Sequence, residues 1–127
     1  MTSIKPIRVV IADDHEMLRS SLTTFFETCD DLLLVGEAVD GEQAVALCVQ
    51  LQPEVVIMDL HLPGMSGIAA TRLIREKCPA TCVIVLTYSA AQEDKQTAFE
   101  AGASRYLLKD VTIDELAMAV RTVHPCT

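Results

Sequence analysis

The stretch Val55-Val56-Ile57-Met58-Asp59 joins an apolar run directly to an acidic residue, and a turn containing Pro63-Gly64 follows it. Short aliphatic runs of this kind are typical of strands buried on both faces of a parallel sheet. Three further runs also end in polar groups: residues 7–12 in Asp13-Asp14, residues 82–86 in Thr87, and residues 106–108 in Lys109. Because the carboxyl ends of parallel strands share one edge of a sheet, these groups are expected to meet there. Three carboxylates beside a hydroxyl and an ammonium suit a divalent cation next to an acceptor carboxylate, which is a phosphoryl-transfer site.

Helices are predicted between the strands, so strand and helix alternate along the whole chain. Apolar residues recur at helical spacing from Met17 to Phe26, and residues 67–77 form a helical segment that stops before Pro79. Three capping pairs predict further helix starts: Asp40 with Gln43, Ser89 with Gln92, and Thr112 with Glu115. The predicted strands are residues 7–12, 32–35, 55–58, 83–86 and 105–108. This (βα)₅ pattern predicts a parallel sheet with right-handed crossovers, its strands uniformly apolar and buried on both faces.

Composition limits the classes of function. The chain has 127 residues, half of them hydrophobic and 4% aromatic, which suits one domain with a single sizeable core. Its formal net charge of −8 disfavours binding to a nucleic-acid backbone. Residues 1–6 form a short polar start that lacks the features of a signal peptide, and no apolar run is long enough to cross a membrane. A cytoplasmic location is therefore the default expectation.

Neither the cysteines nor the glycines indicate a cofactor site of a familiar type. The five cysteines are odd in number and form no C-x-x-C motif, so reduced structural thiols are expected, with Cys48 and Cys82 in the core. Gly64 and Gly67 are assigned to a turn and a helix entry. The sequence contains no G-x-x-x-x-G-K-[ST] or G-x-G-x-x-G motif, which argues against nucleotide binding.

Taken in order, these residues resemble the receiver domain of two-component response regulators. The resemblance covers about residues 7–123 and rests on an ordered set of motifs: Asp13-Asp14, Asp59, Leu62-Pro63-Gly64-Met65-Ser66-Gly67, Thr87, Ala101-Gly102-Ala103, Tyr106 and Lys109. Three segments are most similar to receivers joined to a helix-turn-helix domain of the LuxR/NarL type: Asp13-Asp14-His15, Val35-Gly36-Glu37-Ala38 and Tyr106-Leu107-Leu108-Lys109-Asp110. Most receivers have proline after the lysine, where this chain has Asp110.

The resemblance implies a doubly wound, flavodoxin-like α/β fold, a three-layer sandwich whose five-stranded parallel sheet has the order 2-1-3-4-5. It implies a single receiver domain over residues 1–127, with the folded core at residues 6–123 and the start of a linker, or a cut end, at residues 124–127.

The resemblance also implies the metal site and the phosphoacceptor. Asp59 would accept the phosphoryl group, and Asp14 and Asp59 would bind Mg²⁺ directly, with Mn²⁺ as a substitute. Asp13 would assist through water, and the backbone carbonyl of His61 would complete the protein's share. His15 is not expected to bind the metal, because Mg²⁺ disfavours imidazole ligands. It is interpreted instead as a residue in the first turn of a helix.

Three more residues receive roles from the resemblance. Thr87 would donate its hydroxyl to a phosphoryl oxygen, and Lys109 would pair with Asp59 and then with the phosphoryl group. Tyr106 has two interpretations: an ordinary strand aromatic with its hydroxyl in water, or a switch that turns inward when Thr87 moves.

The sequence thus predicts a signalling switch and not a dedicated enzyme. A histidine kinase would phosphorylate Asp59, and slow self-dephosphorylation would reset the switch. The output would be a C-terminal helix-turn-helix domain beyond Thr127, with the receiver itself a monomer or weak homodimer that binds neither DNA nor membrane. Two alternatives remain: a free-standing receiver that binds a protein target, and a haloacid-dehalogenase-like phosphatase. The second is disfavoured because the acid pair comes first and no D-x-D motif occurs.

Overall fold

The computed structural model describes residues 5–126; residues 1–4 of the predicted polar start (residues 1–6) and Thr127 lie outside the described residues. Its sheet has five parallel strands in the order β2-β1-β3-β4-β5. The strands are β1 Ile7–Ala12, β2 Leu32–Ala38, β3 Val55–Met58, β4 Cys82–Thr87 and β5 Arg105–Leu108. The helices are α1 Glu16–Glu27, α2 Gly41–Leu51, α3 Gly67–Lys77, α4 Gln92–Glu100 and α5 Ile113–Val123. The predicted doubly wound (βα)₅ fold and strand order are confirmed.

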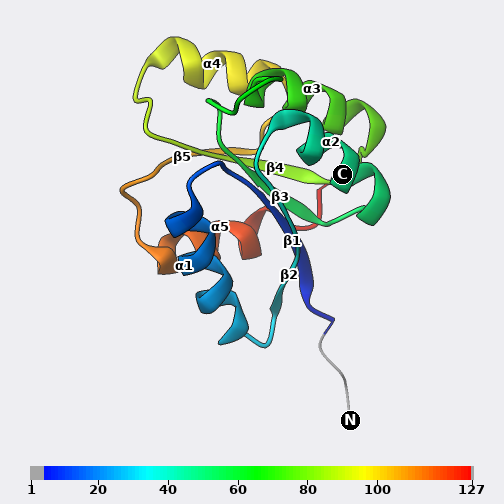
Figure 1. Ribbon diagram of the computed structural model, residues 1–127, viewed down its shortest axis with the longest axis vertical. Helices are drawn as coiled ribbons and strands as arrows, with labels where there is room; N and C mark the ends of the chain where they lie inside the picture. Colours follow the sequence, from blue (N-terminus) through cyan, green and yellow to red (C-terminus); the bar gives the residue numbers. More distant parts are fainter. Residues whose placement is uncertain (1–4, 127) are drawn as a thin grey trace.

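Helices cover both faces of the sheet, as Figure 1 shows. Helices α1 and α5 lie on one face, where residues such as Leu22 and Val120 pack against Ile11 and Ile84. Helices α2, α3 and α4 lie on the opposite face. Two apolar layers therefore sandwich the central strands, which is the arrangement that buries a parallel sheet. Among residues 5–126, none of the helices combines the length and the apolar character that a membrane crossing requires.

The central strands are the most buried part of the molecule. Every residue of β3 and β4 is buried, as is the second half of β1 up to Ala12. The expectation that all strands are equally buried is wrong for the edges, because β2 and β5 each have a neighbour on only one side. Leu33 and Arg105 on these edge strands are exposed.

Strand β2 continues three residues past the predicted end at Val35. The strand passes through Gly36 and ends at Ala38. The pairing of β1 with β2 shifts register between Val9 and Val10, and Ala38 still pairs with Ala12. A bulge of this type accommodates one extra residue without ending the ladder, so the glycine sits within the strand.

The helix starts confirm two of the three predicted capping pairs. The Asp40 side chain accepts a hydrogen bond from the Gln43 backbone N–H at 2.8 Å, and Thr112 Oγ1 accepts one from the Glu115 N–H at 3.0 Å. The prediction for Ser89 is wrong, because Ala91 occupies the N-cap of α4 and makes no side-chain cap. Ser89 Oγ donates instead to the Asp94 carboxylate.

The cysteines of the sheet and of α2 are core residues, as predicted for Cys48 and Cys82; Cys78 is buried as well. Burial raises the pKa of the Cys48 and Cys82 thiols to about 12, so both are neutral and unreactive at physiological pH. Beyond α5, Cys126 packs against the apolar layer that contains Cys82, with its Sγ 3.6 Å from Ser104 Oγ.

A paired charge ties α5 to the loop before β2. Arg121 Nε donates to Asp31 at 2.6 Å and a terminal guanidinium nitrogen donates at 3.0 Å, a two-point contact across 90 residues of sequence. Chiefly through the hydrogen bond from Arg121, the pKa of Asp31 lies below its ordinary value. The pair links the last helix to the edge of the sheet.

Because the folded-state pKa of Asp31 is lowered, its contribution to stability is present above the unfolded pKa and disappears as pH falls through the folded value. We expect Asp31→Asn to lower the free energy of unfolding at pH 7 by about 0.2–1 kcal/mol, the range for exposed pairs. Urea titrations between pH 3 and 7 should show the difference vanish at the acid end. Asp30→Asn, an exposed neighbour, is the control; an equal loss in both variants would rule out the specific pair.

Candidate functional site

The carboxyl edge of the sheet brings together the residues that the sequence placed there. Asp13 follows β1 and is 3% exposed, and Asp59 follows β3 and is 4% exposed. The backbone continues the sheet pattern beyond the strands, because the Asp59 N–H donates to the Ala12 carbonyl and the Lys109 N–H donates to the Thr87 carbonyl. The two buried carboxylates and the last residue of β4 are thus fixed by main-chain hydrogen bonds.

Lys109 joins the two buried carboxylates. Its Nζ lies 2.8 Å from Asp13 Oδ2 and 3.1 Å from Asp59 Oδ2, and only 2% of its side chain is exposed. Burial lowers the pKa of Lys109, but the hydrogen bond to Asp13 and the charges of both carboxylates outweigh it, so the pKa lies above its ordinary value. Lys109 therefore remains an ammonium at physiological pH and bridges the ends of β1, β3 and β5.

Asp14 is the third carboxylate of the site and differs from the other two. Its side chain is 43% exposed, and it makes no ion pair with Lys109. Ligand atoms of Asp13, Asp14, Asp59 and His15 all lie within 4.8 Å of one another. The structure therefore holds two buried acids that share one ammonium, next to one open acid.

His15 takes a position that the sequence interpretation missed. It is the N-cap of α1 and not a first-turn residue, and its backbone N–H donates to Asp13 Oδ1 at 2.8 Å. Its ring Nδ1 lies 2.9 Å from Asp13 Oδ1 and 3.1 Å from Lys109 Nζ. The imidazole thus touches the acids as well as the ammonium. The position of His15 directly after Asp13-Asp14 was the available signal in the sequence. The direction of its ring, however, depends on the hydrogen bond from its backbone N–H to the Asp13 carboxylate.

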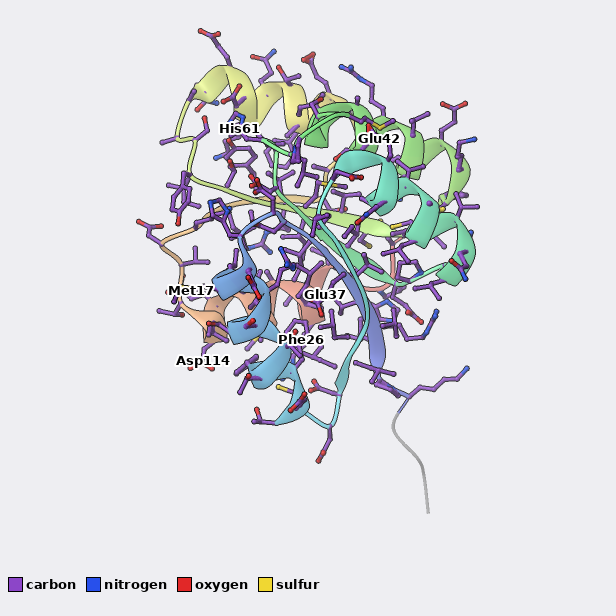
Figure 2. All side chains as sticks on the ribbon, in the orientation of Figure 1. Met17, Phe26, Glu37, Glu42, His61 and Asp114 are labelled. Carbon is purple, nitrogen blue, oxygen red and sulfur yellow. The ribbon has the colours of Figure 1, made fainter. Side chains whose placement is uncertain are left out.

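His61 leaves β3 on the loop toward α3, where Figure 2 shows its side chain. Its backbone N–H lies 3.3 Å from Asp59 Oδ1, and the residue is exposed. The loop backbone thus contacts the Asp59 carboxylate, while the imidazole faces outward.

Two contacts set the path of this loop. A Cβ on Gly67 would collide with the Asp59 carbonyl oxygen, so only glycine lets the start of α3 approach the site this closely. Glu42, at the start of α2 and visible in Figure 2, accepts a hydrogen bond from the Met65 N–H at 2.6 Å. The sequence interpretation did not identify Glu42, because its contact lies 23 residues away.

Thr87 and Tyr106 both contact Ser89, in the loop that joins β4 to α4. Thr87 is fully buried, and its Oγ1 lies 3.4 Å from the Ser89 N–H. The half-buried Tyr106 donates its hydroxyl to the Ser89 carbonyl at 2.7 Å. Burial, opposed by this hydrogen bond and aided by the Asp94 charge, raises the pKa of Tyr106. The interpretation in which the Tyr106 hydroxyl lies in water is therefore wrong: the hydroxyl is bound to the loop that follows Thr87.

Comparison with known proteins agrees with this geometry. Residues 9–121 match the family described as response regulator receiver domain. The chain belongs to this family.

The relatives of this receiver domain include response regulators and a transcriptional regulatory protein. The chain is 44% identical over 115 residues to the transcriptional regulatory protein LiaR of Bacillus subtilis, covering 91% of this chain and 54% of LiaR. It is 36% identical over 120 residues to the nitrate/nitrite response regulator NarL of Escherichia coli K12, covering 94% and 56% of the two chains. The receiver domain thus spans a little over half the length of these relatives.

Solved structures give the same result. A LuxR-family two-component response regulator from Aurantimonas sp. SI85-9A1 superposes with a TM-score of 0.87 at 34% identity, covering 94% of this chain and 85% of the other. The resemblance to receivers of LuxR/NarL-type response regulators is confirmed.

The donor set of this receiver domain fits a hard divalent cation such as Mg²⁺. Carboxylate oxygens are the ligands that Mg²⁺ prefers, and Asp14 offers one that faces solvent. Among the three carboxylates, the single ammonium of Lys109 leaves two negative charges without a compensating lysine. A divalent cation would balance them.

Substitutions of Lys109 and Asp14 should distinguish the buried charges that support the fold from the exposed charge of Asp14. We expect Lys109→Met to lower the free energy of unfolding by about 3–5 kcal/mol, because Asp13 and Asp59 would be left buried without their cation. Asp14→Asn should leave stability unchanged or slightly raised, because it relieves repulsion among the acids. Urea denaturation in chelator-treated buffer measures both. A strong loss in Asp14→Asn would make the open acid structural and contradict this division.

Proposed function

We propose that this receiver domain accepts a phosphoryl group on Asp59 from the phosphohistidine of a sensor kinase. The single observation that carries the proposal is the buried Asp59 carboxylate at the end of β3, held by Lys109 and adjacent to the open Asp14. A carboxylate is a weak nucleophile toward a charged phosphoryl group unless cations neutralise the oxygens. The Lys109 ammonium, 3.1 Å from Asp59, supplies one positive charge, and the acid pair would hold the divalent cation that supplies the rest.

Mg²⁺ is the proposed cofactor, with Mn²⁺ as a substitute. Asp14 and Asp59 would hold it directly, Asp13 through water, and the His61 carbonyl would add a backbone ligand. A bound Mg²⁺ would neutralise charge on the phosphoryl oxygens and on the carboxylates as the transfer proceeds.

The transfer itself is a displacement at phosphorus. An Asp59 carboxylate oxygen forms a bond to phosphorus while the bond from phosphorus to the donor imidazole nitrogen breaks, and that nitrogen keeps the electron pair. Lys109 is placed to exchange its hydrogen bond with Asp59 for one with a phosphoryl oxygen, because its Nζ already reaches Oδ2. Hydrolysis of the acyl phosphate then returns the free carboxylate, so the domain acts as a switch and not as a dedicated enzyme.

The conformational signal is proposed to run from Thr87 to Tyr106. The Thr87 hydroxyl lies next to the Ser89 N–H, and Tyr106 holds the Ser89 carbonyl. A Thr87 hydroxyl that turned toward a phosphoryl oxygen would pull on this segment and on the hydroxyl of Tyr106. The coupling therefore passes through one loop residue that both side chains contact.

The whole protein is proposed to be a cytoplasmic, DNA-binding regulator with a C-terminal helix-turn-helix output domain. Support comes from the similarity to LiaR and NarL, of which this chain spans little more than half. The acidic receiver would not bind nucleic acid or membrane itself and would be a monomer or weak homodimer. A free-standing receiver remains the alternative, whereas family membership argues against the phosphatase.

Incubation with acetyl phosphate and Mg²⁺ tests the phosphoacceptor. We expect intact-mass measurement to show one added phosphoryl group on the wild type and none on Asp59→Asn, because the amide is not a nucleophile for this transfer. Asp110→Asn, an exposed acid just after β5, is the matched control and should be labelled like the wild type. Normal labelling of Asp59→Asn would refute the assignment.

Thermal melts test the cation site without any phosphoryl chemistry. Mg²⁺ at about a hundred times its dissociation constant should stabilise the wild type by about 2.7 kcal/mol. We expect Asp14→Asn to lose this gain, because the open carboxylate is removed. An equal Mg²⁺ effect in Asp14→Asn would exclude Asp14 as a ligand.

A further inference from the structure

Tyr88 is a large aromatic residue at the mouth of the site that the proposed mechanism does not use. It follows Thr87 at the carboxyl end of β4, and 74% of it is exposed. An exposed ring of this size is not held by the apolar core, so its position depends on contacts at the surface.

Two contacts of the Tyr88 ring are with residues of the site. Lys109 Nζ lies 4.9 Å from the centre of the ring, within the range of a cation–π contact. The His15 ring meets it edge-on, with the ring centres 6.1 Å apart and the planes at 90°. These contacts join residues that follow β1, β4 and β5, so the ring spans the edge of the sheet above Lys109.

Shielding of Lys109 agrees with this position. Its side chain is 2% exposed although the residue lies at the open edge of the sheet, whereas Asp14 on the same edge is 43% exposed. The two carboxylates contact the ammonium at 2.8 Å and 3.1 Å. The Tyr88 ring and the His15 imidazole contact the same ammonium, at 4.9 Å from the ring centre and 3.1 Å from Nδ1.

We propose that Tyr88, assisted by His15, is a positioning residue that covers the Lys109 side of the site and slows hydrolysis of the acyl phosphate. This inference rests on the proposed phosphoacceptor function of Asp59. In hydrolysis, a water oxygen forms a bond to phosphorus, the bond from phosphorus to the Asp59 oxygen breaks, and the carboxylate leaves with the electron pair. Inorganic phosphate and a proton are released. A ring that limits the entry of water on one side of the site lengthens the life of the phosphorylated state.

The proposed cover, the Tyr88 ring, is held by few contacts. Tyr88 is tied to the site by a cation–π contact and an edge contact, so it can swing away without disturbing the core. Tyr88 is also the neighbour of Thr87, so a displacement of Thr87 toward a phosphoryl group would carry the base of the cover with it.

The decisive experiment compares the rates at which phosphorylated variants lose the phosphoryl group. After labelling with acetyl phosphate and Mg²⁺ and removal of the donor, intact mass is followed over time. We expect Tyr88→Ala to lose the label about three- to tenfold faster than the wild type, the range that loss of one ring–cation contact and its shielding would give. Tyr88→Phe should match the wild type, because the ring and not the hydroxyl makes the contacts.

Phe99→Ala is the matched control, because Phe99 is also an exposed aromatic, 42% exposed, but lies on α4. It should lose the label at the wild-type rate. Equal rates in Tyr88→Ala and the wild type, or a Tyr88→Phe protein as fast as Tyr88→Ala, would overturn the proposed cover.

A second measurement needs no phosphorylation and so separates the two proposals. A small acylating reagent that reacts with amines should modify Lys109 slowly in the wild type and several-fold faster in Tyr88→Ala. Mass spectrometry of the peptides measures the modification, and the exposed Lys95 is the internal reference. Unchanged Lys109 acylation in Tyr88→Ala would overturn the cover. Failure of the wild type to take up any phosphoryl group would instead refute the proposed function and leave the acylation result to judge the cover.

Discussion

The contact of the Lys109 ammonium with Asp13 and Asp59 is the interaction on which the site depends. Each carboxylate is about 96% buried, and a buried carboxylate without a cation is strongly unfavourable. The three residues follow different strands, so the contact exists only when β1, β3 and β5 are in register. Pairing of these strands therefore brings the ammonium to both buried carboxylates, and the negative charge that Lys109 leaves unbalanced suits a divalent cation.

The sheet that carries this contact is fully buried at its centre and partly exposed at its edges. β3 and β4 are fully buried, and main-chain hydrogen bonds beyond their ends fix Asp59 and Thr87. The connecting loops, in contrast, depend on single contacts such as Gly67 against the Asp59 carbonyl and Tyr106 on the Ser89 carbonyl. Such a design places reactive groups on fixed supports and leaves neighbouring segments free to change.

Much of this architecture is local in the sequence. Alternating apolar runs and helical periodicities predicted all five strands and the order of the helices, and the caps at Asp40 and Thr112 predicted two helix starts. The errors were also local: the second strand was ended at Val35, three residues too early, and Ser89 was taken as a helix cap. In both cases a contact elsewhere, the bulge against β1 or the bond from Tyr106, decided the conformation.

The sequence by itself determined that Asp13, Asp59, Thr87 and Lys109 reach one edge, because the ends of parallel strands have no other place to go. Only the tertiary structure decided which side chains touch. The bridge formed by Lys109, the pair between Arg121 and Asp31 across 90 residues, and the rings of His15 and Tyr88 around the ammonium all depend on side-chain directions. The directions of these side chains follow from packing between segments that are distant in the sequence, so they cannot be predicted from the periodicity of the chain.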